Sequence, residues 1–383
     1  MHCNGAHGAP YIYVKTMAKF SNKTILVTGA CGTVGSQLIR SLLTSDDYSP
    51  DQVVGIDHNE SELFFLDQAY IKEPRVSFFL ADIRDRDVLV KSMQGVDIVF
   101  HSAALKHVIL CERSPYESVQ TNIMGVQNII CAAESNGVEK VIFTSSDKAV
   151  NPTNVMGTSK LMGERLMTAA NSSARKFDTI FASTRFGNVL GSNGSVIPIF
   201  RQQIKSGGPV TLTDQAMTRF VMTIEESVRL VIDSALQAEG GEVFITKMPV
   251  IKIADLAEVM IDLLAPEFGY SPDEIQIEVI GSKPGEKMYE ELMSQEETRR
   301  AVELPNYFAV LPAFRGIYRH TEYNYENLVT DQVTDPYVSE EAECLTKDQL
   351  RSFLIANVLL ADEDEQRIME ARYWPGDKEE RGE

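Results

Sequence analysis

The chain has 383 residues, 44% of them hydrophobic, which is enough for one large soluble domain or two modest ones with a sizeable core. Its formal net charge of -19 argues against nucleic acid as a partner, because an acidic chain repels phosphate backbones, and no run of residues approaches the ~18 apolar residues of a membrane-spanning helix. The five scattered cysteines contain no C-x-x-C pair and argue against a disulfide framework or a zinc site, so we expect a cytoplasmic protein without a bound metal.

Short apolar segments alternate with amphipathic ones in the first part of the chain. The apolar segments predict strands over residues 24–29, 52–57, 76–82, 97–103 and 140–146. The spacing of apolar residues between them predicts helices over residues 36–45, 61–72, 86–94 and 118–136. Continuous apolar strands separated by helices are typical of a parallel sheet covered on both faces. We therefore expect the α/β class, with a doubly wound parallel sheet over residues 23–190.

The second half of the chain has a looser order. A helix over residues 160–171 and a strand over 179–191 continue the first pattern, and the later elements are expected over residues 225–237, 241–246, 253–264 and 276–281. We expect residues 191–313 to form a smaller C-terminal substrate-binding lobe, interleaved with the first domain, at the C-terminal ends of the strands, where ligands bind in such folds. Residues 1–22 are expected to be a flexible leader. Residues 314–383 are expected to be an extension with a charged tail, in which residues 341–369 include a helical segment.

A glycine-rich turn follows the first predicted strand in TILVTGACGTVGSQLIR. Gly29, Gly32 and Gly35 permit a tight turn and let a pyrophosphate approach the backbone at a helix N-terminus, which favours negative charge. Three glycines alone are a weak signal and also suit a plain strand–helix turn, but the strand-turn-helix context makes this signal strong. We therefore expect a dinucleotide cofactor here, contacted also by Thr33 and Val34.

The ends of the following strands carry the other residues expected at the cofactor. Asp57 ends the second strand, where a carboxylate accepts hydrogen bonds from the adenosine ribose and repels a 2′-phosphate, so NAD is favoured over NADP. A solvated aspartate is the alternative, and His58 partly offsets the repulsion. His101 is expected to be a packed or hydrogen-bonded histidine and not a catalyst. The further cofactor contacts expected are Asp82, Ile83, Ser102, Ala103, Ala104 and Asn122.

The stretch TSSDKAVNPTNVMGTSK carries residues suited to proton transfer. Asp147 and Lys148 are adjacent at the end of a predicted strand, so a carboxyl group and an amine, which suit an acid and a base, lie side by side there. Lys160 lies on the following helix, for which Thr153 and Asn154 are candidate N-caps. The alternative interpretation of the Asp-Lys pair is a simple exposed turn.

The chain resembles the nucleotide-sugar 4,6-dehydratases of polysaccharide biosynthesis, within the extended short-chain dehydrogenase/reductases. The resemblance covers residues 23–310 and rests on the glycine-rich turn and on HSAALKHV, ESVQTNIMGVQNII, TSSDKAVNPTNVMGTSK, TRFGNVLGSNGSVIPIF, MTRFVMTIEESV and GSKPGEKMYEEL. It implies a Rossmann-like fold, NAD as the cofactor, a homo-oligomer, and a nucleotide-sugar substrate, UDP-N-acetylglucosamine.

The resemblance also implies a reaction and roles in it. NAD takes a hydride from sugar C4, water is lost across C5 and C6, and the hydride returns to C6. Asp147 is then the acid at the C6 oxygen, Lys148 works at C5, and Lys160 holds the nicotinamide ribose. A nucleotide-sugar 4-epimerase shares the fold, NAD and the hydride step, and it stays open as an alternative.

Met156 departs from the pattern of many relatives, which place a tyrosine four residues before the helical lysine, on the same helix face. The chain is similar here to a subset of these dehydratases that carries methionine. In one interpretation the site is inactive and only binds NAD and a nucleotide sugar. In the other, Asp147 takes the C4 hydroxyl proton, through Ser146, and later delivers it to the C6 oxygen. We favour the second, because Asp147, Lys148 and Lys160 all remain.

The smaller lobe offers residues for the rest of the substrate. The guanidinium groups of Arg185 and Arg219 suit a diphosphate, and Asn188 and Ser195 suit the sugar or a phosphate. Glu286 is expected at the nucleotide ribose, and Lys283 stands where relatives tend to have arginine. The substrate contacts expected are therefore Lys106, Arg185, Asn188, Ser195, Arg219, Lys283 and Glu286.

Overall fold

The computed structural model describes residues 18–173, 178–191, 195–281, 285–314, 321–357 and 359–360. Its centre is a nine-stranded sheet with the order β14-β15-β10-β6-β5-β4-β1-β2-β3. The parallel strands are β1 (Thr24–Thr28), β2 (Gln52–Asp57), β3 (Val76–Leu80), β4 (Ile98–His101), β5 (Lys140–Ser146), β6 (Ile180–Phe186) and β10 (Val243–Thr246). The antiparallel strands at one edge are β15 (Tyr307–Val310) and β14 (Ala301–Glu303).

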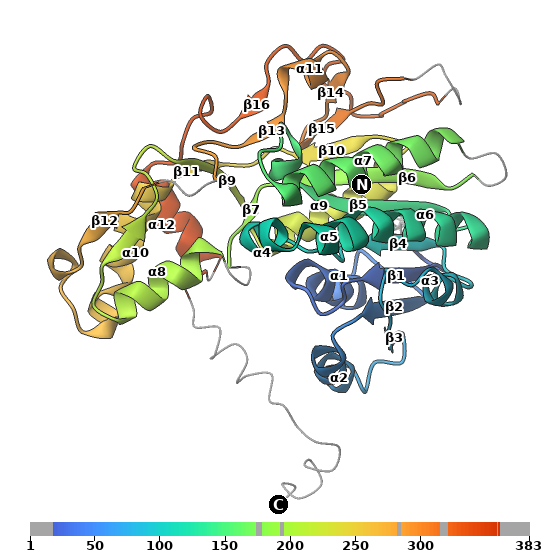
Figure 1. Ribbon diagram of the computed structural model, residues 1–383, viewed down its shortest axis with the longest axis horizontal. Helices are drawn as coiled ribbons and strands as arrows, with labels where there is room; N and C mark the ends of the chain where they lie inside the picture. Colours follow the sequence, from blue (N-terminus) through green and yellow to red (C-terminus); the bar gives the residue numbers. More distant parts are fainter. Residues whose placement is uncertain are drawn as a thin grey trace, which may run out of the picture.

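Helices cover both faces of this sheet, as the sequence predicts (Figure 1). One layer contains α1 (Thr33–Thr44) and α9 (Ile224–Gln237), and the other contains α3 (Arg86–Ser92), α6 (Gly125–Asn136) and α7 (Val155–Ser173). Successive side chains of β1 point to opposite layers, since Ile25 and Leu26 are buried in different core clusters. The α/β class and the Rossmann-like, doubly wound sheet are therefore confirmed. α2 (Glu60–Ala69) lies beside β3 at the other edge.

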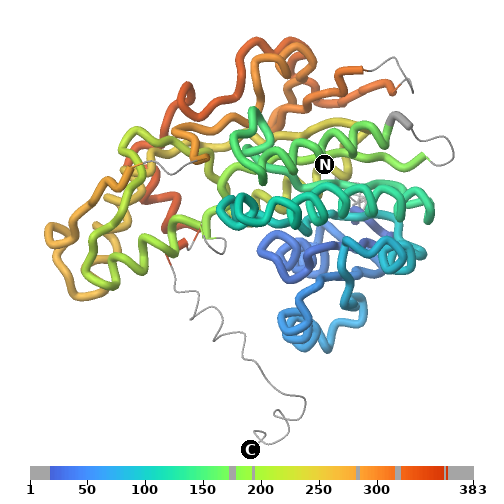
Figure 2. Tube along the Cα trace, viewed as in Figure 1, coloured from blue at the N-terminus to red at the C-terminus, as the bar shows by residue number. Residues whose placement is uncertain are grey.

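The smaller lobe lies beside the C-terminal ends of these strands, at the left of Figure 1. Its helices are α8 (Val196–Lys205), α10 (Ile253–Leu264) and α12 (Lys347–Ala356). Its strands are β7 (Asn188–Val189), β9 (Thr218–Met222) and β11 (Val250–Lys252) in one sheet, and β8 (Val210–Leu212) and β12 (Ile277–Val279) in another. Figure 2 shows α12, from the red end of the chain, lying among much earlier segments. Leu350 and Leu354 of α12 are buried in one core with Leu256 of α10.

Several local predictions differ from the structure. α9 and β10 fall within the range predicted for the smaller lobe but belong to the main sheet and its helical layer, so the two parts interleave, as the sequence predicts. The long helix predicted over residues 118–136 begins with a π-helical turn over Val119–Met124. Elements that the sequence did not predict include α8, α4 (Val108–Arg113), α5 (Pro115–Ser118), α11 (Gln295–Thr298) and the paired strands β13 (Glu291–Met293) and β16 (Tyr337–Val338).

The expected leader and tail fall mostly outside the described residues, which begin at 18 and end at 360. Within them, Phe20 is buried in the main core, so the last part of the expected leader packs on the sheet. The helical segment expected in the C-terminal extension is α12, and Thr346 caps its N-terminus. None of the described helices is both long and apolar enough to cross a membrane.

Candidate functional site

The glycine-rich turn after β1 is packed against the end of β4. Gly29 has φ +70°, and a Cβ on it would lie 2.8 Å from the Ala103 nitrogen. A Cβ on Gly35 would lie 2.0 Å from the Gly29 oxygen, so neither position tolerates a side chain. One carboxylate oxygen of Asp57 accepts the Cys31 N–H at 3.0 Å. The structure thus brings together the turn, the end of β2 and the residues after β4, as the sequence predicts.

Other predicted cofactor residues lie at the same edge of the sheet. The Ser102 hydroxyl donates to the Thr28 oxygen at 2.6 Å, and Ala103 donates its N–H to the Thr28 hydroxyl at 3.2 Å. Asp82 pairs with Arg84 at 2.6 Å. The remaining predicted residues of this edge are Gly32, Thr33, Val34, His58, which is exposed, Ile83, which is buried, and Ala104.

Asn122 and Lys160 are buried, and both tie elements together. The Asn122 amide donates to the Leu105 oxygen and to the Ser159 hydroxyl, each at 2.9 Å, and so joins the chain after β4 to α7. Lys160 Nζ donates to the Thr144 oxygen at 2.8 Å. Burial lowers the pKa of the Lys160 ammonium to about 8. The ammonium of this lysine is therefore held against the C-terminal part of β5.

His101 is fully buried, and its Nδ1 lies 2.7 Å from the Thr28 hydroxyl oxygen. Burial, assisted by the charge of Lys160, lowers the pKa of the imidazole to about 3, so the ring stays neutral. The prediction of a packed, hydrogen-bonded histidine is confirmed.

Asp147 and Lys148 form a short 3-10 turn directly after β5. Lys148 Nζ lies 2.9 and 3.1 Å from the two Asp147 oxygens, and the Ser146 hydroxyl donates to Asp147 at 2.7 Å. Asp147 is only 4% exposed, which excludes the simple exposed turn. Burial by itself would raise the pKa of Asp147, but the Lys148 ammonium and the Ser146 hydroxyl outweigh it and hold this pKa below its ordinary value.

The start of α7 lies directly against this turn. A Cβ on Gly157 would lie 2.1 Å from the Lys148 oxygen, so the close contact requires glycine. The Asn154 side chain accepts the Gly157 N–H at 2.8 Å and thereby serves as the N-cap, in preference to Thr153. Met156 is buried and lies on this first helical turn, one residue before the glycine.

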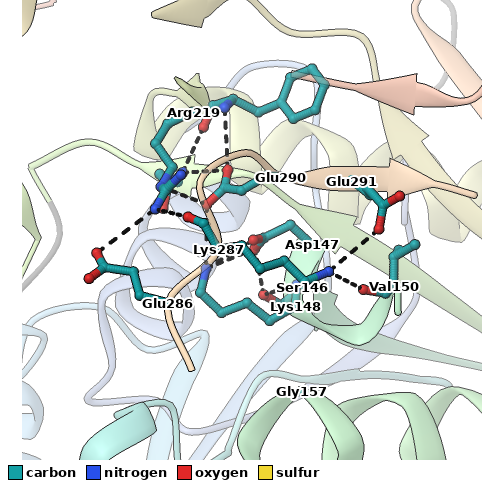
Figure 3. Close-up of polar contacts among 12 residues, drawn as sticks. Ser146, Asp147, Lys148, Val150, Gly157, Arg219, Glu286, Lys287, Glu290 and Glu291 are labelled. Carbon is teal, nitrogen blue, oxygen red and sulfur yellow. Dashed lines mark hydrogen bonds and ion pairs between the residues drawn. The ribbon is translucent and has the colours of Figure 1, made fainter. Parts of the chain in front are cut away.

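Glu290 is a buried carboxylate that the sequence reasoning missed (Figure 3). Its Oε1 lies 3.7 Å from Lys148 Nζ and 3.2 Å from Arg219 Nε. Its Oε2 accepts the Asn188 amide at 2.8 Å and the Phe220 N–H at 3.3 Å. Burial, with the nearby charge of Asp147, raises the pKa of Glu290 to about 7 against the opposing cations.

A cavity of about 400 Å³ opens beside these groups, a volume that suits a small-molecule ligand. The turn after β5 supplies Asp147 and Lys148, and β9 supplies Arg219. Arg219 is held at the wall by N–H donation to the Thr218 and Lys287 oxygens, each at 2.8 Å. Of the other predicted substrate residues, Asn188, Ser195 and Glu286 line the cavity.

Arg185 is not at this cavity, which corrects the expected diphosphate contact. Its guanidinium is 1% exposed and lies between Glu164 and Glu297, each 2.8 Å away. The remaining donor reaches the Leu292 oxygen at 2.9 Å. All its N–H groups are thereby paired, since guanidinium has five donors and each finds a protein acceptor.

Two other residues predicted to contact the substrate are not among the described residues that line the cavity. Lys283 lies outside the described residues. Lys106 follows the end of β4, is exposed and does not line the cavity. Within the part of the chain that the structure describes, no three histidine, cysteine or carboxylate side chains gather as metal ligands would.

The chain matches the family model described as polysaccharide biosynthesis protein over residues 25–312. It is 45% identical to an uncharacterized membrane protein of Methanocaldococcus jannaschii, over 88% of this chain and 96% of the relative. It is 37% identical to an inverting UDP-N-acetylglucosamine 4,6-dehydratase of Campylobacter jejuni, over 80% of this chain and 87% of the relative. It is also 35% identical to a UDP-glucose 4-epimerase of Rickettsia canadensis, over 88% of this chain and 96% of the relative.

Solved structures show the same architecture. The X-ray structure of Pen from Bacillus thuringiensis superposes with a TM-score of 0.80 at 40% identity, and covers 88% of this chain and 98% of that one. A UDP-glucuronic acid 4-epimerase from Bacillus cereus, in complex with UDP-glucuronic acid and NAD, gives a TM-score of 0.58 at 26% identity. The match covers 69% of this chain and 88% of that one.

Proposed function

This chain belongs to the polysaccharide biosynthesis protein family, and from that premise we propose that it is an NAD-dependent nucleotide-sugar 4,6-dehydratase acting on UDP-N-acetylglucosamine. The observation that carries the proposal is the buried Asp147–Lys148 pair at the wall of the cavity. The product is a UDP-2-acetamido-2,6-dideoxy-4-hexulose for the biosynthesis of surface polysaccharide or glycan. The relatives that are 4,6-dehydratases and 4-epimerases support an enzyme acting on nucleotide sugars.

The residues at the edge of the sheet fit a dinucleotide. Gly29 and Gly35 let the turn pack closely against Ala103 and against itself, and α1 begins at this turn, where the helix N-terminus favours a pyrophosphate. Asp57 accepts the backbone N–H groups of Cys31 and Asn59 and lies 3.4 Å from His58 Nδ1, and a carboxylate with about four acceptor positions keeps capacity for ribose hydroxyls. This capacity favours NAD over NADP. When bound, NAD supplies the acceptor for the C4 hydride and its donor at C6.

The protein's own groups handle the protons. Asp147, paired with Ser146, takes the proton of the C4 hydroxyl and later delivers it to the departing C6 oxygen. Lys148 removes the C5 proton and later returns a proton to C5. Lys160, held by the Thr144 oxygen, contacts the nicotinamide ribose. Met156 cannot accept a proton, so the base for the C4 hydroxyl is Asp147.

The cavity residues are proposed to hold the rest of the substrate. Arg219 faces the diphosphate, Asn188 and Ser195 the sugar or a phosphate, and Glu286 the nucleotide ribose. Lys106 and Lys283 complete the proposed set, and Arg185 is excluded because its donors are paired internally. We further propose a homo-oligomer working in the cytoplasm.

Incubation with UDP-N-acetylglucosamine and NAD tests the proposal. Mass spectrometry and NMR of the product are expected to show the loss of one water and a 4-keto, 6-deoxy sugar. A product of unchanged mass with altered configuration at C4 would instead favour the epimerase, for which the Rickettsia relative argues. Ligand binding without any product would favour an inactive NAD-binding protein.

A further inference from the structure

Glu290 borders the reacting groups and has no part in the reaction as described above. It is 4% exposed, and it lines the same cavity as Asp147 and Lys148. Its two oxygens are held separately: Oε2 by the Asn188 amide at 2.8 Å, and Oε1 by Arg219 at 3.2 Å, on the side of Lys148. A carboxylate fixed in this way faces the lysine with a defined oxygen.

Lys148 cannot remove the C5 proton while it is an ammonium. Burial alone would lower the pKa of Lys148, but the carboxylates of Asp147 and Glu290 outweigh it and raise this pKa. The resting lysine is therefore protonated and must lose a proton before it acts as a base. Asp147 is unsuited to take that proton, because in the proposed reaction it already holds the proton of the C4 hydroxyl. A second acceptor is needed within reach of Nζ.

We propose that Glu290 is this acceptor, a positioning residue that takes a proton from Lys148 and so turns it into the base for C5; this inference rests on the proposed dehydratase function. An N–H bond of Lys148 breaks, a bond from that proton to Glu290 Oε1 forms, and a neutral amine is left beside a carboxylic acid. The present separation of the two atoms is 3.7 Å, and the flexible lysine stem, 33% exposed to the cavity, permits the shorter approach.

The remaining steps balance. The amine takes the C5 proton, the C5 electron pair forms the C5–C6 double bond, the C6–O bond breaks, and Asp147 protonates the leaving oxygen to give water. When C6 has received its hydride, the Lys148 ammonium returns a proton to C5. Glu290 then returns its proton to Lys148, so that all three side chains regain their starting states and only water has been lost.

The charges around Glu290 suit a group that both takes and gives a proton. Asp147 and Lys148 face it from the turn after β5, Arg219 faces it from β9, and Glu286 lies beyond Arg219 at 3.9 Å. Burial raises the pKa of Glu290 to about 7, with Asp147 adding to the rise. A carboxyl group with a pKa near the working pH populates both its charged and its neutral form, as a group that takes and later returns a proton requires.

Glu290→Gln tests the inference, because glutamine keeps the size and an acceptor oxygen but cannot titrate. Glu291→Gln is the matched control: the same change one residue away, on a side chain that points toward Lys287 and Val150, away from the reacting groups (Figure 3). In deuterated water with UDP-N-acetylglucosamine and NAD, we expect Glu290→Gln to accumulate reduced nicotinamide. Its water loss and deuterium incorporation at C5 should fall about 10²-fold or more, with KM changed little. Glu290→Asp should recover part of the loss.

An infrared titration of the free enzyme gives a readout that needs no turnover. A carboxylic acid band that titrates near neutral pH is expected in the wild type and in Glu291→Gln, and it should vanish in Glu290→Gln. Loss of water at the wild-type rate by Glu290→Gln, an unchanged infrared titration, or an equal loss of C4 oxidation and dehydration would each overturn the inference. Failure of the wild type to dehydrate the sugar would overturn the proposed function, and this inference with it.

Discussion

The Arg185 cluster and the Asp147–Lys148 cluster both bury carboxylates with cations, but only the second borders the cavity. Arg185 lies between Glu164 and Glu297, with every N–H donor paired. Burial would raise the pKa of Glu297, but Arg185 outweighs it and holds the pKa at about 2. Arg185 and Glu297 therefore keep their charges over the whole physiological range.

The cavity cluster contains the same kinds of group in a different arrangement. The carboxylates of Asp147 and Glu290 both face the ammonium of Lys148, and the pKa of Glu290 is about 7. The comparison teaches that burial of ions does not by itself indicate chemistry. A saturated guanidinium between two carboxylates stabilises the fold, whereas two carboxylates around one lysine leave a group able to change its charge.

Arg185→Met should have the largest effect on folding. It leaves Glu164 and Glu297 buried without their cation, and breaking a buried pair in this way costs about 3–5 kcal/mol. Urea unfolding measures the loss. Arg75→Met is the control, since Arg75 pairs with Glu73 near the surface, and about 1 kcal/mol or less is expected from that pair. Equal losses in the two variants would remove the distinction between a fixed buried cluster and a surface pair.

Asp147→Asn should show the opposite pattern, with activity lost and folding retained. Lys148 keeps Glu290 as a partner, so no unpaired charge is left behind. Both C4 oxidation and water loss should fall by about 10²–10³-fold, or about 3–4 kcal/mol in the barrier. Reduced nicotinamide and product mass measure the two steps. If this variant still accumulated reduced nicotinamide at the wild-type rate, the role of Asp147 at the C4 hydroxyl would be wrong.

The two clusters should respond to pH with opposite signs. The pKa of Glu297 falls from an ordinary 4.5 to about 2, so its stabilisation is complete above pH 4.5 and is lost as the pH falls toward 2. The pKa of Glu290 rises from 4.5 to about 7, so its contribution is complete below pH 4.5 and is lost as the pH rises toward 7. Each amounts to about 3 kcal/mol at most.

Unfolding free energies measured across pH check this prediction. Glu297→Gln should flatten the acid part of the profile, and Glu290→Gln should flatten the part between pH 4.5 and 7. The same sign of slope for both groups would contradict the assignment of one cluster to the fold and the other to proton transfer.

Arg219→Lys should have the smallest effect. Lysine keeps the charge beside Glu290 but loses the planar fork that holds a diphosphate and donates to the Thr218 and Lys287 oxygens. An increase of about 10-fold in KM for the nucleotide sugar is expected, about 1.4 kcal/mol, with the Kd for NAD unchanged. Steady-state kinetics measure the KM for the nucleotide sugar, and a titration with NAD measures the Kd for the cofactor. Weaker NAD binding with an unchanged KM would place Arg219 outside the substrate site.

The sequence predicted those parts of the molecule that depend on neighbouring residues. The glycine turn at Gly29, the strand before Asp147 and the cap at Asn154 are encoded in short stretches, and they lie where expected. The π-helical turn at Val119–Met124 was missed, because its apolar spacing in the sequence is that of an ordinary helix.

The positions of Arg185 and Glu290 were harder to predict, because the residues around them come from segments that are distant in the sequence. The sequence around Arg185 does not predict that Glu164 and Glu297, which belong to α7 and α11, will be its partners. Glu290 and Glu291 are adjacent in the sequence, and only their positions just before and at the start of β13 decide which one faces the cavity. The only signal in the sequence for a buried carboxylate here was the pair of adjacent glutamates after GSKPGEKMY, and that signal does not show which of the two faces the cavity.

The position of α12 has a consequence for how the molecule is made. The main sheet draws its parallel strands from residues 24–246, whereas Leu350 and Leu354 complete a core that also contains Leu190 and Phe200. A ribosome therefore releases the parallel strands of the sheet long before it releases the apolar side chains of α12. The wall of the cavity formed by β7, β9 and β11 gains the support of α12 only after α12 has been made, later than the strands of the proposed dinucleotide edge.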